Sequence, residues 1–144
     1  MSLFQAIGTA ASSLTVQRTW MDAISDNIAN VNTVRPWDEA PFQARMVIAQ
    51  AVGANGGAGT SDGSSGIGRG TSVVGIALDG SPEGRIVYDP SHPFANDEGL
   101  VRQAEVDLGD QMVQLLTAQR AYQANLAVVE RARDAYQAAL QIGR

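Results

Sequence analysis

The sequence predicts a mainly α-helical chain with a small β-rich insert, in which long N- and C-terminal helices pack as a coiled-coil bundle. Near both ends, apolar residues recur at alternating steps of four and three, which is the spacing of helices that pack along a seam. Between the ends, short β-like runs are separated by turn-forming residues. We therefore expect an N-terminal helical segment in residues 1–33, a β-rich module in residues 34–104 and a C-terminal helical segment in residues 105–144.

The N-terminal helix is expected to run from Ser2 to about Val31, a length of roughly 45 Å at about 1.5 Å per residue. Ser2 is a candidate N-cap, and Pro36 marks the end because the residue before a proline is driven out of the helical conformation. Gly8 weakens a helix by about 1 kcal/mol relative to Ala. We therefore interpret Gly8 as a point where two helices approach closely.

The middle segment is expected to contain three strands. They are Pro41–Gln50, Thr71–Leu78 and Arg85–Tyr88. The stretch Gly53–Gly70 holds eight of the fifteen glycines, and we predict a flexible loop there because such a composition buries too little apolar surface. A phosphate-binding loop is disfavoured, since it should lead into a helix and a strand-like run follows instead.

The C-terminal helix is expected to run from near Glu105 to about Ile142, roughly 55 Å if it is continuous. Acidic residues crowd its start and arginines lie toward its end, an arrangement that complements the helix dipole. Gly143 is a candidate terminator.

Both helical segments carry few charges. There is none from Ser2 to Gln17, and only Arg120 from Gln111 to Val129. The outer positions are mostly Ala, Ser, Thr, Gln and Asn, whereas a coiled coil that faces water carries Glu, Lys or Arg there. Because a lone pair of helices would leave these faces in water, the pattern favours a multi-subunit bundle over an intrachain hairpin, which remains the simpler alternative.

Composition narrows the classes of function. The 144 residues carry fifteen acids and ten bases, a net charge of −5, and every base is Arg. An acidic chain without a basic patch argues against nucleic acid as a partner. We also expect no transmembrane segment and no cleaved signal peptide. With no Cys, no Lys and a single His, the chain lacks the groups for thiol, Schiff-base and multi-histidine metal chemistry, so we expect a non-enzyme without cofactor or metal.

Three groups of ionisable residues have simpler explanations than catalysis. His92 lies in a turn, with no second His or Cys to complete a site. The Asp97-Glu98 pair lacks the alternating oxygen ligands of a calcium loop. Asp22 and Asp26 lie one helical turn apart and fit the exposed face of the first helix. We therefore predict no catalytic, cofactor-binding or metal-binding residue.

Three segments resemble the flagellar axial proteins, the family of rod, hook and filament-type subunits. Residues 25–33 (SDNIANVNT) resemble the N-terminal signature of this family. Residues 122–125 (YQAN), with the helix that follows to Ala132, resemble its C-terminal motif. Residues 87–101 (VYDPSHPFANDEGLV) are similar to the middle segment that marks the C-type subunit of the proximal rod. The resemblance covers most of the chain and is thin only over the glycine-rich loop.

The resemblance implies a structural subunit of the proximal rod in the flagellar basal body. Members of the family pass unfolded through the flagellar export apparatus without a cleaved signal, and then polymerise with themselves and other rod proteins into a helical tube. Their terminal helices form its inner, axial layer and are disordered before assembly. The rod crosses the periplasm and transmits motor torque to the hook.

We predict that the assembly interface consists of the seam positions together with asparagines that fix helix ends or contact other subunits. The predicted interface residues are Leu3, Ile7, Leu14, Met21, Ile24, Asn27, Ile28, Asn30, Asn32, Met112, Leu115, Gln119, Tyr122, Asn125, Leu126, Val129, Tyr136 and Leu140. Two other interpretations remain open, a sister subunit of the proximal rod and a cytoplasmic coiled-coil adaptor with a β-rich binding module.

Overall fold

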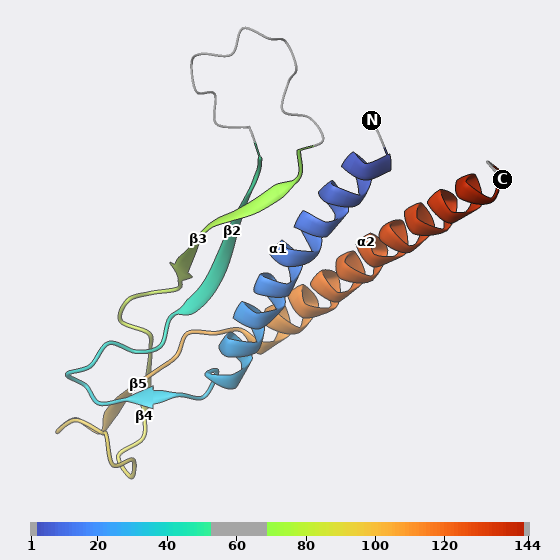
Figure 1. Ribbon diagram of the computed structural model, residues 1–144. Helices are drawn as coiled ribbons and strands as arrows, with labels where there is room; N and C mark the ends of the chain where they lie inside the picture. Colours follow the sequence, from blue (N-terminus) through green and yellow to red (C-terminus); the bar gives the residue numbers. More distant parts are fainter. Residues whose placement is uncertain (1–2, 53–68, 143–144) are drawn as a thin grey trace, which may run out of the picture. The chain divides into compact units, whose positions relative to one another are not determined.

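The computed structural model describes residues 3–52 and 69–142 and contains two long helices with short strands between them (Figure 1). In chain order the elements are α1 (Leu3–Ala29), β1 (Val34–Arg35), β2 (Ala44–Ala51), β3 (Thr71–Asp79), β4 (Arg85–Tyr88), β5 (Leu100–Gln103) and α2 (Leu108–Ile142). The predicted fold class, long terminal helices around a small β region, is confirmed. Most of the predicted glycine-rich loop, residues 53–68, lies outside the described residues, as do Ser2 and Gly143.

Local capping sets the ends of both helices. α2 begins at Leu108 rather than near Glu105, because Oδ1 of Asp107 accepts hydrogen bonds from the N–H groups of Gly109 (2.7 Å) and Asp110 (3.1 Å) and so caps the first turn. α1 ends at Ala29, where Nδ2 of Asn30 donates to the carbonyl of Asp26 at 2.8 Å.

The expected close approach at Gly8 does not occur within the described chain. A Cβ at this position would meet nothing within 4 Å outside the helix's own backbone. The glycine therefore faces open space, and its cost to the helix is not offset by packing against another described segment of the same chain.

The chain forms two compact units. One contains Met1–Thr19, Ile48–Gly75 and Thr117–Arg144, and the other contains Trp20–Val47 and Ile76–Leu116. Each helix, and each strand of the two-stranded β2–β3 sheet, contributes to both units.

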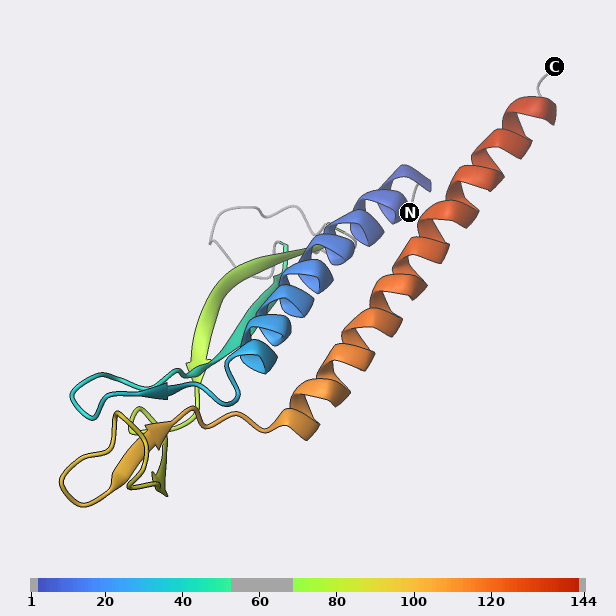
Figure 2. The same ribbon diagram turned by 90° about the horizontal axis from the view of Figure 1, so that it is seen from below.

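The second of these units holds a three-stranded antiparallel sheet in the order β1-β5-β4. Val101 of β5 pairs with Val87 of β4 and is buried at the centre. The strands β1 and β5 were not predicted, since β1 has only two residues and the four residues of β5 (LVRQ) do not alternate between apolar and polar. Within this unit, the last turns of α1 lie beside the first turns of α2 (Figures 1 and 2).

The other unit joins the N-terminal part of α1, the C-terminal part of α2, the end of β2 and the start of β3. Its buried hydrophobic side chains are Ala10, Ala118 and Ala132. Oγ of Ser12 accepts a hydrogen bond from the N–H of Thr71 at 3.0 Å. Next to this bond Gly70 has a φ of +94°, and a Cβ there would come within 2.3 Å of the Ser12 hydroxyl. Glycine at position 70 is therefore required by both conformation and space.

No helix in the described ranges is both long enough and apolar enough to cross a lipid bilayer.

Candidate assembly interface

On α1 the predicted interface residues divide by exposure. Ile24 and Asn27 are buried inside the chain. The partly exposed ones are Ile7, Leu14, Met21, Ile28 and Asn30. Asn32 follows the helix and is exposed, and the side chain of Leu3 lies outside the described residues. One part of the set therefore holds the chain's own fold, and the other part is accessible to a neighbouring molecule.

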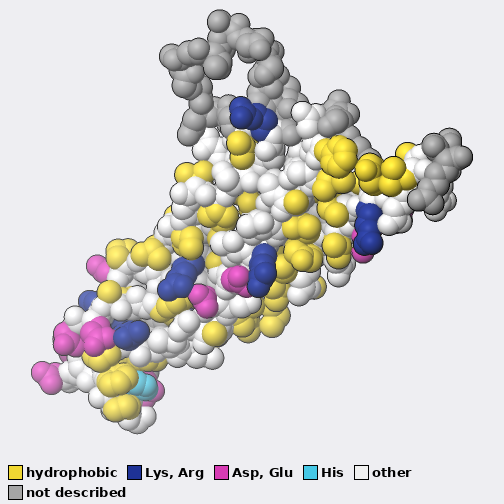
Figure 3. Space-filling view, in the orientation of Figure 1, with side chains coloured by type: hydrophobic (Ala, Val, Ile, Leu, Met, Phe, Trp, Pro, Cys, Tyr) yellow, Lys and Arg dark blue, Asp and Glu magenta, His cyan; other side chains and the backbone are white. Residues whose placement is uncertain are grey.

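α2 presents its predicted interface residues more openly. The exposed ones are Met112, Gln119, Leu126, Tyr136 and Leu140. The partly exposed ones are Leu115, Tyr122, Asn125 and Val129. In the unit that contains both, the ring of Tyr136 meets the ring of Phe4 edge-on, with 5.7 Å between the centroids. Figure 3 shows hydrophobic side chains reaching the surface over much of the face that it draws, with charged side chains in small groups between them.

Sequence reasoning missed several exposed apolar residues. On the helices they are Phe4, Val113, Leu116 and Val128. On β2 and β3 they are Met46, Ile48, Val73, Val74, Ile76 and Leu78, and around the β4–β5 turn they are Ile86, Tyr88 and Phe94. For α2 the available signal was the lack of charge between Gln111 and Val129. For the strands, the alternation marks two faces but does not say which one is covered.

Asn27 makes three hydrogen bonds through its side chain. Its Oδ1 accepts a hydrogen bond from the backbone N–H of Arg45 at 2.8 Å, and its Nδ2 donates to the carbonyl of the same residue at 3.0 Å. Nδ2 also donates to Oε1 of Gln111 at 2.9 Å. Asn27 thereby links the end of α1 to the start of β2 and the first turns of α2.

Few charged contacts reinforce this arrangement. Arg45 forms an ion pair with Asp26 at 2.7 Å, but both side chains are about half exposed to solvent. Such pairs contribute roughly 0–1 kcal/mol. The buried amides therefore matter more to the geometry than the surface charges do.

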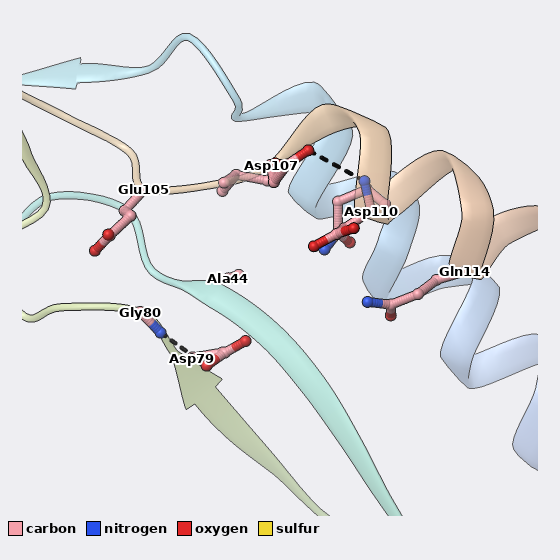
Figure 4. Close-up of a pocket in the computed structure, with 9 residues that line it drawn as sticks. Ala44, Asp79, Gly80, Glu105, Asp107, Asp110 and Gln114 are labelled. Atoms are coloured by element: carbon pink, nitrogen blue, oxygen red, sulfur yellow. Dashed lines mark hydrogen bonds between the residues drawn. The ribbon is translucent and has the colours of Figure 1, made fainter.

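An acidic pocket lies where the end of β3 meets the start of α2 (Figure 4). Its carboxylates come from Asp79, Glu105, Asp107 and Asp110. Three of them already accept backbone hydrogen bonds, Asp79 from Gly80, Glu105 from Ser81, and Asp107 as the cap of α2. In the described ranges, no group of His, Cys, Asp and Glu is arranged to hold a metal ion. Turn and cap formation explain most of these carboxylates.

The turn between β4 and β5 is held together by its own side chains. The Ser91 hydroxyl donates to Asp89 at 2.7 Å and lowers the pKa of that carboxyl. Nδ1 of His92 accepts the N–H of Phe94 at 3.1 Å, and Oδ1 of Asn96 accepts the N–H of Leu100 at 2.8 Å. His92 therefore has a structural contact in the turn, in agreement with its interpretation from the sequence.

Two family models match this chain. The model described as "Flagella basal body rod protein" matches residues 7–36, and the one described as "Flagellar basal body rod FlgEFG protein C-terminal" matches residues 98–142. The chain is 34% identical to the flagellar basal-body rod protein FlgC of Bacillus subtilis (strain 168), with all of both chains covered. It is 37% identical to FlgC of Borreliella burgdorferi over 99% of this chain and 98% of that relative. It is 31% identical to FlgC of Escherichia coli O6:H1 over the full length of both.

This chain belongs to the FlgC family of flagellar basal-body rod proteins.

Family membership confirms the assignment that the three sequence segments indicated, a structural subunit of the flagellar basal-body rod of the C type. The matches also bear on the geometry of this FlgC-family chain. Asn27 lies in the segment matched by the first model, and Gln111 lies in the segment matched by the second. The Asn27–Gln111 hydrogen bond therefore joins the two parts of the chain that are shared with rod proteins in general.

Proposed function

We propose that this FlgC-family chain is a non-enzymatic subunit of the proximal rod, and that it polymerises through its terminal helices into the drive shaft that carries motor torque across the periplasm. The observation that carries this proposal is the exposed apolar surface of α2. Large apolar side chains at Met112, Val113, Leu116, Leu126 and Leu140 are exposed. Large apolar side chains left exposed on one helix are typical of a surface that contacts other protein.

Coiled-coil packing between subunits would cover these side chains. The heptad spacing of α2 places Met112, Leu126 and Leu140 at seam positions. Most of the buried hydrophobic residues of the described chain are alanines, so many of its larger apolar side chains lie outside the core. On this view the predicted interface residues that are exposed contact neighbouring subunits, and Ile24 and Asn27 hold the helix that presents them.

Partners and location follow from the same proposal. The chain binds copies of itself and other rod proteins, and it reaches the periplasm unfolded through the flagellar export apparatus without a cleaved signal. The absence of cysteine suits such a route, because no disulfide has to form before or after passage. No catalysis is proposed, since His92 and most pocket carboxylates are occupied by structural hydrogen bonds.

Substitution of Leu126 tests the proposal. Leu126 is 40% exposed, so Leu126→Asp should leave the chain folded but place a charge in the subunit interface. We expect normal amounts of the variant in cells, its absence from isolated basal bodies by immunoblot, and loss of swimming. Gln123→Asp adds the same charge at an exposed polar residue of the same helix and is the matched control. Basal bodies that contain Leu126→Asp at the wild-type level would contradict the proposal.

A further inference from the structure

Asn27 and Gln111 are the two buried polar side chains in the described part of the chain, and they are bonded to each other. Asn27 is 1% exposed and Gln111 is 8% exposed, and 2.9 Å separates Nδ2 of Asn27 from Oε1 of Gln111. A buried amide is stable only when it is hydrogen-bonded. Each of these two residues therefore restricts where the other can lie.

The side chain of Asn27 is fully used. A carboxamide has two N–H donors and one carbonyl acceptor. One donor and the acceptor pair with the backbone of Arg45, and the other donor pairs with Gln111. A carboxylate would lack both donors and an aliphatic side chain would lack all three groups, so this position requires the amide.

The apolar contacts around the pair leave part of the alignment of the helices to the amides. Besides Ile24, the buried hydrophobic residues of this unit include Ala23, Ala44 and Ala104, whose small side chains give few distinct interlocking positions. If α2 moved along α1 by one helical turn, Gln111 would shift by about 5.4 Å and the hydrogen bond between the two amides would be lost. A single buried polar pair is known to select one register among otherwise similar apolar packings.

We propose that Asn27 and Gln111 are positioning residues that fix the register of α1 against β2 and α2, and thereby determine which apolar side chains the two helices present to neighbouring subunits. The inference rests on the proposed function in the rod. The sequence left two roles open for Asn27, fixing a helix end or contacting other subunits. The positioning role differs from the second, because the structure gives the polar atoms of Asn27 partners within the same chain.

The first test replaces Gln111 in a strain that lacks the chromosomal gene. Gln111→Met keeps the shape and length of the side chain but removes the acceptor for Asn27. Gln114→Met makes the same change at an exposed residue that lines the same pocket. Basal bodies with complete rods are counted by electron microscopy, and cellular amounts of each variant are measured by immunoblot.

We expect Gln111→Met to reduce complete rods by about tenfold or more at a normal cellular level, because a buried donor is left unpaired. Gln114→Met should match wild type. Equal rod counts for Gln111→Met and wild type would overturn the inference. If the wild-type gene itself fails to restore rods, the proposed function in the rod is wrong. That result is distinct from a failure of the inference about Asn27 and Gln111, which requires that the wild-type gene restores rods.

A second measurement reads the register directly. The chain has no cysteine, so introduced pairs react without background. The pair Phe4→Cys with Tyr136→Cys replaces two rings that are in contact, whereas Phe4→Cys with Leu140→Cys samples a position one turn further along α2. With a short bismaleimide on the full chain, we expect the first pair to crosslink preferentially and Gln111→Met to reduce that preference severalfold. An unchanged preference in Gln111→Met would refute a role in register, even if rods are lost.

Discussion

Gly84 illustrates how a single residue fixes the local structure of the sheet unit. Its φ is +67°, in the left-handed region that favours glycine. A Cβ at this position would lie 2.5 Å from the backbone carbonyl oxygen of Gln103 and 2.8 Å from Cγ of Pro41. Because a backbone oxygen and a proline ring are both rigid, neither neighbour is free to move aside.

Gly84→Ala should therefore destabilise this unit, by about 1–3 kcal/mol from the backbone conformation alone and by more from the collision with Gln103. Both tryptophans, Trp20 and Trp37, belong to the same unit, so urea unfolding followed by tryptophan fluorescence reports on it. Glu83→Ala is the control, because Glu83 precedes Gly84 in the same unit and its side chain is exposed to solvent. Equal urea midpoints for the two variants would show that position 84 tolerates a Cβ.

At the scale of elements, the start of α2 depends on the Asp107 cap. Its carboxylate satisfies the N–H groups of Gly109 and Asp110, which otherwise have no partner within the helix. The acids near this end also interact favourably with the positive end of the helix dipole. Gln111, which binds Asn27, lies in the first turn of this helix, and its own N–H donates to the carbonyl of Asp107 at 3.0 Å.

Asp107→Ala should cost about 1 kcal/mol of unfolding free energy, whereas Asp107→Asn should lose much less because the amide oxygen still accepts from the helix N–H groups. Thermal unfolding followed by circular dichroism distinguishes the two. If Asp107→Asn is as unstable as Asp107→Ala, the charge rather than the hydrogen bond is what stabilises the start of α2.

The elements show which features a sequence pattern reveals. The periodicity of apolar residues predicted both helices, and β4 has the predicted bounds Arg85–Tyr88. The strands β1 and β5 were missed because their pairing is set by contacts such as Val34 with Gln103, which are distant in sequence. The partner of Asn27 could not be predicted either. Asn27 bonds to the backbone N–H and C=O of Arg45, and almost any residue type at position 45 would supply these groups.

At the scale of the whole molecule, the distribution of apolar residues connects the fold to its function. The largest fully buried side chains in the described ranges are Ile24 and Asn27, while Met112, Val113 and Leu116 are among many large apolar residues left exposed. The heptad pattern identified candidate interface residues but did not separate internal from external ones. That separation depends on the three-dimensional arrangement, because a seam position looks alike in sequence whether the partner helix comes from the same chain or from another.

Imaging basal bodies from a strain without the gene tests whether this FlgC-family chain is an essential subunit of the rod. The gene is deleted, isolated basal bodies are examined by electron microscopy, and a complemented strain serves as the control. We predict intact membrane rings without rod or hook in the deletion strain, and complete structures after complementation. Complete, motile flagella in the deletion strain would contradict the account.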